Sequence, residues 1–356
     1  MKKLCMGVLG LGEGRSIISA VLQSEYWTLG NICDLNEELC QERCREFDFR
    51  RYTTRYEEML EDTTIDVIGI YTPDQLHARH IKMALEAGKD VICTKPLMIG
   101  LGEAKELIET QKKSGRSVFV GQSSRYFETA IRQREDYEAG KLGELVTMEA
   151  HYISDSRWFL ERGWSHQKGF SWMYNFMIHA VDLAAWYLPQ IEEVFGFGTV
   201  SANTVSYQLG VPDTMKFLFR DRDGKFASVI GAYATPSFGK EVEQSISCTL
   251  RGTKGISRGG SNFQYYLKQE GEKAARIQDF SAKMPYYYRF EGNTHHAGEY
   301  QNYIEYFARE KQAGQTPRPD LTEGIHTLAI MEAMEKSLQS GQKILVSQVL
   351  RGYDLL

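Results

Sequence analysis

The sequence predicts an α/β protein of two domains. Residues 1–122 are expected to form a doubly wound parallel sheet, and residues 123–356 an α+β domain with a large, mainly antiparallel open sheet. Three observations lead to this prediction. The chain is longer than one hydrophobic core usually supports, its first third alternates apolar runs with amphipathic stretches, and the remainder is rich in β-type runs separated by glycine-containing turns.

The strands of the first domain are predicted from short runs rich in Val, Ile, Leu and Cys. These runs cover residues 4–10, 29–34, 66–72, 90–95 and 117–122. The stretches between them have the apolar spacing of amphipathic helices, and two of these stretches end at Gly88 and Gly115, as helix C-termini do. Because strands and helices alternate, the sheet should be parallel and covered on both faces. Ligands of such sheets bind beyond the carboxyl ends of the strands.

The strands of the second domain are predicted from runs that few long helices separate. The runs are "VTMEAHY", "IEEVFGFG", "TMKFLFR", "FASVIGAYAT" and "SISCTLRGTKGI". Direct connection by turns predicts antiparallel pairing.

The composition limits the kinds of partner. A formal net charge of −5 argues against an electrostatic grip on nucleic acid or on an anionic membrane, so a small, neutral or weakly charged partner is expected. Glycines and charged residues interrupt the N-terminal apolar run, which argues against a signal peptide. No segment reaches the roughly 18 apolar residues of a membrane helix.

The six cysteines form no C-x-x-C pair. Cys40 and Cys44 lie four apart on a predicted helix, but no histidine is near in sequence to complete a metal shell. We therefore predict no metal site and free thiols in a reducing cytoplasm.

The first strand-to-helix turn reads "GVLGLGEGRS" and predicts a dinucleotide site. Gly10 and Gly12 fill the first two places of G-x-G-x-x-G, where a tight turn and close approach to a pyrophosphate require glycine. Arg15 occupies the third place, with Gly14 one position early, so Arg15 could contact the pyrophosphate or a 2′-phosphate. The residues assigned to the cofactor here are Gly10, Leu11, Gly12, Gly14 and Arg15.

Asp34 follows the second predicted strand, in "NICDLN". A carboxylate at this place can accept both ribose hydroxyls of adenosine and repel a 2′-phosphate, which favours NAD over NADP. Alternatively, Asp34 caps the helix that starts near Asn36.

Two later strand ends indicate a family. "DVIGIYTPDQLHARH" places Thr72, Pro73 and His77 after a buried strand, and "DVICTKPL" places Lys95 and Pro96 after the next. These stretches resemble the T-P-[ND]-x-x-H and E-K-P motifs of the glucose–fructose oxidoreductase, inositol dehydrogenase and rhizopine-catabolism (Gfo/Idh/MocA) family of nicotinamide enzymes. The resemblance implies a Rossmann-type first domain, an active-site lysine at Lys95, and cofactor contacts from Thr72, Pro73, His77, Lys95 and Pro96. Thr94 departs from the family's glutamate. His77 either reaches the nicotinamide or caps its own helix.

The second half resembles the same family, so the likeness covers nearly the whole chain. Arg125 and Tyr126 match an Arg-aromatic pair at the entry to the substrate domain, and "PRPDLTEGIHTLAIMEAMEKSLQSGQKI" resembles the family's terminal helix, at about 323–340, which packs back near the first domain. In "GFSWMYNFMIHAVDLAAWYL", His179 and Asp182 match a helical motif of the substrate pocket. Asn175 and Met177 stand where the family has aspartate and glycine.

Spacing of four would place Asn175 and His179 on one face of an α-helix, where both could meet one ligand. Asp182 is expected to serve as a salt-bridge or cap partner instead of a base. His295 and His296 precede the last helices and are a further hypothesis for substrate contacts.

The resemblance implies an NAD-dependent dehydrogenase that acts on a ring hydroxyl of a sugar, glycoside or cyclitol. A near-neutral histidine suits the base and an ammonium suits the stabiliser of the developing alkoxide, so His179 and Lys95 are assigned these catalytic roles, which could be reversed. Substrate contacts are expected from Lys95, Arg125, Tyr126, Asn175 and His179. Trp and Tyr in the second half, without a basic cluster for phosphate, favour a sugar or glycoside.

Two other functions stay open. One is a glycosidase that keeps NAD bound and works by oxidation, elimination and reduction. The other is a non-catalytic NAD-binding regulator, which the departures at Thr94, Asn175 and Met177 would permit. The resemblance also implies a homo-oligomer, a dimer or tetramer, formed through the exposed face of the second sheet.

Overall fold

A computed structural model describes residues 2–161, 163–166, 170–238, 242, 244–261, 265–280, 282 and 298–356. The chain divides into two compact units. Unit 1 contains the chain up to Ser123 and a later segment that ends at His326. Unit 2 begins at Ser124 and takes in Thr327–Leu356. His295 and His296 lie outside the described residues.

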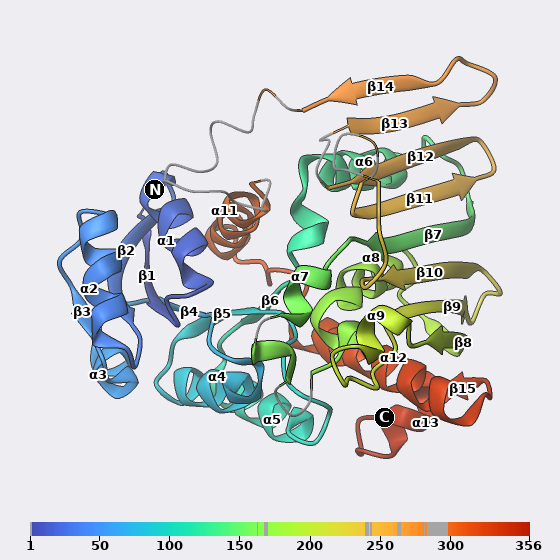
Figure 1. The fold of residues 1–356 in the computed structure, drawn as a ribbon. Helices are drawn as coiled ribbons and strands as arrows, with labels where there is room; N and C mark the ends of the chain where they lie inside the picture. The colour runs from blue at the N-terminus through green and yellow to red at the C-terminus, as the bar shows by residue number, and fades with distance from the viewer. Residues whose placement is uncertain are drawn as a thin grey trace. The chain divides into compact units, whose positions relative to one another are not determined.

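Unit 1 is built on a six-stranded parallel sheet of order β3-β2-β1-β4-β5-β6 (Figure 1). The strands are β1 (Leu4–Leu9), β2 (Trp27–Cys33), β3 (Tyr52–Thr53), β4 (Val67–Ile70), β5 (Asp90–Thr94) and β6 (Val118–Gly121). Every residue of β4 and β6 is buried, so both faces of the sheet are covered. The predicted doubly wound parallel sheet is confirmed.

The helices of unit 1 connect successive strands, as expected for parallel pairing. They are α1 (Gly14–Gln23), α2 (Glu37–Glu46), α3 (Tyr56–Glu61), the short η1 (Asp74–Leu76), α4 (His77–Glu86) and α5 (Ala104–Ser114). Gly88 and Gly115 follow α4 and α5 with φ of +72° and +65°, the left-handed conformation that commonly ends a helix.

Helix α11 (Glu299–Gln312) also belongs to unit 1, although it comes after the second sheet in sequence. Aromatic side chains fasten it: the Trp27 indole donates to the carbonyl of Ile304 at 2.8 Å and packs on Phe307 with ring centroids 5.8 Å apart. The hydroxyls of Tyr71 and Tyr303 meet at 2.5 Å. The helix is therefore anchored to β2 and to the end of β4.

Unit 2 contains a nine-stranded sheet of order β14-β13-β12-β11-β7-β10-β9-β8-β15 (Figure 1). The strands are β7 (Leu145–Ile153), β8 (Ile191–Thr199), β9 (Thr214–Asp221), β10 (Phe226–Ala232), β11 (Ile246–Gly252), β12 (Gly255–Gly260), β13 (Tyr265–Glu270), β14 (Arg276–Asp279) and β15 (Ile344–Leu345). Within the described residues β7 and β10 pair in parallel, and the other neighbours are antiparallel. The predicted, mainly antiparallel sheet is confirmed.

Buried and exposed residues alternate along β9, so this part of the sheet is covered on one face and open on the other. Helices α6 (Glu128–Glu138) and α8 (Ile178–Tyr187) pack against the strands, and Ser337 of α12 (Leu321–Ser340) accepts from the Gly196 amide of β8. The shorter helices are η2 (Ser123–Tyr126), α7 (Arg157–Leu160), η3 (Gly163–His166), η4 (Met173–Met177), α9 (Ala202–Val205) and α13 (Val346–Arg351). No helix in the described part of the chain is long and apolar enough to cross a membrane.

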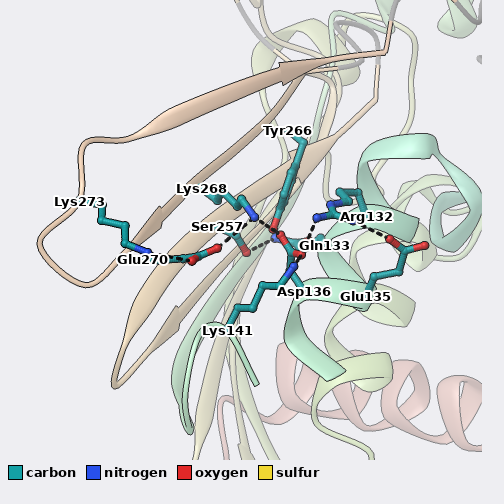
Figure 2. Close-up of polar contacts among 10 residues, drawn as sticks. All are labelled: Arg132, Gln133, Glu135, Asp136, Lys141, Ser257, Tyr266, Lys268, Glu270 and Lys273. Atoms are coloured by element: carbon teal, nitrogen blue, oxygen red, sulfur yellow. Dashed lines mark hydrogen bonds and ion pairs between the residues drawn. The ribbon is translucent and has the colours of Figure 1, made fainter. Parts of the chain in front are cut away.

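A buried carboxylate joins α6 to the far strands of this sheet (Figure 2). Asp136 is fully buried, and its oxygens lie 2.6 Å from Lys141 Nζ, 2.8 Å from Lys268 Nζ and 3.0 Å from Arg132 Nη2. The Tyr266 hydroxyl donates to it at 3.1 Å. Burial alone would raise the pKa of Asp136, but the hydrogen bonds from Lys141, Lys268 and Tyr266 outweigh it and lower the pKa.

We expect Asp136→Asn to lower the free energy of unfolding by about 2–3 kcal/mol, because three clustered cations lose their shared anion. Urea denaturation measures this loss. Glu135→Gln is the matched control, since Glu135 also pairs with Arg132 but is 58% exposed, and it should cost less than about 0.5 kcal/mol. Equal losses in the two variants would contradict this account of the network.

Candidate cofactor and active site

The predicted cofactor residues of unit 1 gather at one edge of its sheet. Gly10 follows β1, Asp34 follows β2, Thr72 follows β4 and Lys95 follows β5, all at the carboxyl ends of the strands. The order of the sheet reverses between β1 and β4. A crevice at such a switch point is where open α/β sheets bind ligands.

The glycine turn fits a dinucleotide, as three different glycine environments show. Gly10 has φ of +87°, and a Cβ there would lie 2.5 Å from the carbonyl oxygen of Tyr71. A Cβ on Gly12 would meet none of the described residues within 4 Å, so the backbone there is open to a pyrophosphate. A Cβ on Gly14 would lie 3.0 Å from Val8 Cγ1, so Gly14 supplies the close helix–strand packing expected of the third glycine.

Asp34 binds the glycine turn instead of capping α2. Its Oδ2 accepts from the Leu11 amide at 2.8 Å and its Oδ1 from the Asn36 amide at 3.0 Å. The N-cap of α2 is Asn36, whose side chain accepts from the Leu39 amide. A carboxylate has about four acceptor positions, so Asp34 keeps capacity for ribose hydroxyls.

His77 ties the ends of β4 and β5 together. Its imidazole is buried, with Nδ1 2.7 Å from the carbonyl oxygen of Pro96 and Nε2 2.7 Å from that of Thr72. The side chain makes no cap for α4, which begins at His77 itself. Through this bridge the two loops that carry Thr72, Pro73, Lys95 and Pro96 are held in fixed register.

His80, to which the sequence motifs gave no role, holds the side chain of Thr72. Its Nδ1 lies 3.0 Å from Thr72 Oγ1. Burial, and then the neighbouring His77, lower the pKa of His80 to about 4 from its usual value near 6.5. The ring is therefore neutral in the folded protein at physiological pH.

This shift predicts a loss of stability in mild acid. Below about pH 6.5 the unfolded chain binds a proton at residue 80, whereas the folded chain does not until about pH 4, so the contribution present at neutral pH is lost as the pH falls. We expect the wild-type protein to lose about 1–2 kcal/mol more than His80→Gln between pH 7 and pH 4.5. Urea midpoints at the two pH values measure the difference. Parallel pH profiles would contradict the assignment.

Lys95 is half-buried at the end of β5. Burial lowers the pKa of its ammonium, and the carboxylates of Asp74 and Glu13 oppose that change. Glu13 lies in the glycine turn and accepts from the Tyr300 hydroxyl of α11 at 2.7 Å. Both carboxylates lie inside the motifs that indicate the family, at "GLGEGR" and "TPDQLH", but the motifs gave neither of them a role. The family has a glutamate directly before the lysine, and this chain has Thr94 there. The negative charges that act on Lys95 here come from Glu13 and Asp74.

The candidate base of unit 2, His179, lies on α8, half-buried. Its Nδ1 is 2.8 Å from Ser124 Oγ, and its ring meets the ring of Tyr152 edge-on at 5.7 Å between centroids. When Nδ1 carries the proton and donates to Ser124, the lone pair is on Nε2, the state that a base requires. Ser124 was not assigned from the sequence, although it directly precedes Arg125.

Asn175 lies in η4, a turn of π-helix, and not in the α-helix that the spacing argument assumed. Its Oδ1 accepts from the Ser171 amide at 3.2 Å. The i→i+5 pattern of this turn changes the angular offset between Asn175 and His179 from that of an α-helix. Such π-turns occur frequently at functional sites.

Arg125 and Asp182 form a buried, bidentate ion pair. Arg125 Nε lies 2.7 Å from Asp182 Oδ2 and Nη2 lies 2.8 Å from Oδ1, and the side chains are 3% and 1% exposed. The Thr327 hydroxyl donates to Asp182 at 3.4 Å. The expectation that Asp182 is a salt-bridge partner is confirmed. Tyr126 is also buried. A contact of Arg125 or Tyr126 with substrate stays a prediction.

Comparison with known proteins identifies the family. Residues 4–122 match the oxidoreductase family with an NAD-binding Rossmann fold, and residues 134–346 match its C-terminal alpha/beta domain. The first match confirms the prediction of NAD as the cofactor.

Curated relatives include levoglucosan dehydrogenase of Pseudarthrobacter phenanthrenivorans, 26% identical over 54% of this chain and 53% of that protein. The NAD(+)-dependent scyllo-inositol 2-dehydrogenase of Bacillus subtilis is 24% identical over 96% of this chain and 94% of that protein. An uncharacterized oxidoreductase of Schizosaccharomyces pombe is 34% identical over 37% of this chain. The match spans 36% of that yeast protein. The chain therefore covers about a third of the yeast oxidoreductase and about half of levoglucosan dehydrogenase.

Solved structures show the same fold. An oxidoreductase from Agrobacterium radiobacter, in complex with NAD+, L-tartaric acid and magnesium, has a TM-score of 0.85 at 18% identity and covers 98% of this chain and 100% of its own. Levoglucosan dehydrogenase in complex with NADH has a TM-score of 0.82 at 20% identity, covering 97% and 99%. Because both of its domains match, the chain belongs to the Gfo/Idh/MocA oxidoreductase family.

Proposed function

We propose that this protein is an NAD-dependent dehydrogenase that transfers a hydride between a ring secondary hydroxyl of a sugar, glycoside or cyclitol and the nicotinamide. The observation that carries the proposal is the convergence, in unit 1, of an open glycine turn, the Asp34 carboxylate and the Lys95 ammonium at the carboxyl ends of neighbouring strands. Relatives named for levoglucosan and scyllo-inositol support a ring alcohol as substrate.

Different residues of unit 1 suit the successive parts of the NAD molecule. The open backbone at Gly12 suits the pyrophosphate and Asp34 the adenosine ribose. Gly10, Leu11, Gly14 and Arg15 complete the proposed cradle, and Thr72, Pro73, Lys95 and Pro96 are proposed for the nicotinamide end. His77, whose buried ring bonds to the carbonyls of Thr72 and Pro96, is proposed to position these loops. When bound, NAD supplies the hydride acceptor. We propose NAD over NADP because Asp34 would repel a 2′-phosphate.

The proposed chemistry moves one proton and stabilises one charge. His179 takes the hydroxyl proton at Nε2, while Ser124 holds Nδ1. Lys95 donates a hydrogen bond to the same oxygen as negative charge develops on it. The reverse assignment is open to a lysine whose pKa is lowered by burial. What supports the pairing is the family motif to which each residue belongs, K-P at 95–96 and H-x-x-D at 179–182.

Asn175, Arg125 and Tyr126 are proposed to contact the substrate. An amide hydrogen-bonds a hydroxyl but takes no proton, so Asn175 would orient the sugar without acting as a base. We further propose a homo-oligomer, because Phe197, Leu218 and Phe226 are exposed on the strands of the second sheet. We also propose a cytoplasmic location, a reducing compartment that suits a chain with six free cysteines.

The test is a panel of free sugars, inositols and glycosides, each supplied with NAD or NADP, with NADH or NADPH followed by absorbance. We expect formation of NADH that depends on both the protein and a ring alcohol. Cleavage of a glycoside without net NADH would replace this proposal with the oxidation–elimination glycosidase. Tight NAD binding with no turnover across the panel would favour a non-catalytic regulator.

A further inference from the structure

Two arginines beside the glycine turn share one carboxylate, that of Glu46. Arg15, in the first turn of α1, donates from Nε to both Glu46 oxygens at 2.8 and 3.0 Å, and its Nη2 also bonds to Glu46. Arg43 of α2 approaches the same carboxylate, with Nη1 3.0 Å from Oε2. Glu46, the last residue of α2, therefore pairs with both guanidinium groups.

These ion pairs connect directly to the glycine turn through Leu11. Arg43 Nε donates to the Leu11 carbonyl at 3.2 Å, and the Leu11 amide donates to Asp34 at 2.8 Å. Leu11 is thus held by the carboxylate proposed for the ribose on one side and by an arginine on the other. Leu11 therefore connects the ion pair of Arg43 and Glu46 to Asp34, the residue proposed to bind the adenosine ribose.

The charge of this cluster bears on the choice between NAD and NADP. NADP differs from NAD by a 2′-phosphate, which carries between one and two negative charges near neutral pH and is bound by a nearby arginine in NADP-specific sites. Arginine suits a phosphate because its donors form a planar fork. Here Glu42 and Glu46 pair with Arg15 and Arg43, so the two guanidinium groups are balanced by two carboxylates. The Asp34 carboxylate, bound to the Leu11 amide, adds a further negative charge beside the turn.

We propose that Glu46 is a specificity-determining residue that keeps this site selective for NAD over NADP. Asp34 repels a 2′-phosphate directly, and Glu46 adds to this by keeping Arg15 and Arg43 ion-paired, so that neither presents an uncompensated charge. The inference rests on the proposed NAD-dependent function and extends it to a residue outside the glycine motif and the strand ends.

The test is isothermal titration of the full chain with NAD and, separately, with NADP, so that no substrate is needed. The unchanged protein should bind NAD at least tenfold more tightly than NADP. In Glu46→Gln we expect NADP affinity to rise about tenfold, while NAD affinity changes less than threefold. The gain should be lost in the double variant Glu46→Gln/Arg15→Gln, which would identify Arg15 as the phosphate contact.

Glu42→Gln is the matched control. Glu42 lies 2.6 Å from Arg43 but is 59% exposed, so water already screens its charge, and NADP affinity should change less than twofold. Circular dichroism and thermal melting confirm folding, and Glu46→Ala carries the same prediction should Glu46→Gln fold poorly.

The outcomes separate the two proposals. A protein that binds neither dinucleotide overturns the proposed function and this inference with it. A protein that binds NAD selectively, with folded Glu46 variants that gain no affinity for NADP, overturns only the role of Glu46. An equal gain in Glu42→Gln would also overturn it, because general loss of negative charge would then explain the result.

Discussion

Replacing Lys95 with methionine is expected to lower kcat/KM by about 10²–10³-fold on whichever sugar or cyclitol the protein oxidises. Methionine keeps most of the length and apolar volume of lysine but removes the ammonium. In the proposed chemistry that ammonium donates to the oxygen on which negative charge develops. Losing one such donor typically costs a rate factor of this size. The steady-state rate of NADH formation measures it.

Two further variants make the Lys95 prediction specific. Lys82→Met removes an exposed ammonium of α4 that pairs with Glu106, and its kcat/KM should stay within twofold of the wild-type value. Lys95→Arg keeps the positive charge in a wider planar group and should recover part of the rate. NAD affinity should change little in Lys95→Met, because the donor acts on the substrate oxygen. Wild-type turnover in a folded Lys95→Met protein would remove Lys95 from the mechanism.

Replacing Asp182 with asparagine is expected to lower the free energy of unfolding by about 3–5 kcal/mol. The change leaves the Arg125 guanidinium, which is 3% exposed, without its buried counter-charge. An uncompensated buried charge is among the most destabilising defects that a single substitution produces. Because Asp182 lies one turn after His179 on α8, activity should fall as well.

A double variant tests the physical reason for this loss. Arg125→Met/Asp182→Leu removes both charges, and a buried ion pair replaced by apolar side chains is often close to neutral in stability. We therefore expect the double variant to be more stable than Asp182→Asn alone. Urea unfolding at constant m-value gives both quantities. A loss below about 1 kcal/mol in Asp182→Asn would show that the pair contributes little.

The strands and helices of unit 1 could be predicted because their signals are local. Each strand is a short apolar run, and the helices between them keep one apolar face, with a left-handed glycine after α4 and α5. The two-residue strand β3 was missed, since Tyr52–Thr53 is too short to show a period.

The features that the sequence did not reveal depend on partners distant along the chain. The membership of α11 in unit 1 depends on Trp27 and Tyr71 meeting Ile304 and Tyr303, more than 200 residues away. The parallel pairing of β7 with β10 follows from the path of the intervening chain. The π-turn η4 has no distinguishing sequence signal in the apolar stretch around Asn175.

The candidate site shows the same division. Motif spacing indicated Gly10, Asp34, Lys95 and His179, because family signatures are contiguous in sequence. Their partners follow only from three-dimensional contacts: Ser124 reaches Nδ1 of His179 across 55 positions, and Glu46 meets Arg15 across 31. Residue type alone could not distinguish these from ordinary surface or core residues.

Isotope transfer tests the central claim most directly. A ring alcohol that is active on the panel is prepared with deuterium on the carbon that bears the oxidised hydroxyl, and the NADH formed with unlabelled NAD is analysed by mass spectrometry. Our account predicts one deuterium on C4 of the nicotinamide for each turnover. Unlabelled NADH, or label released to water while the sugar is converted, would show that the hydride does not pass from this carbon to NAD.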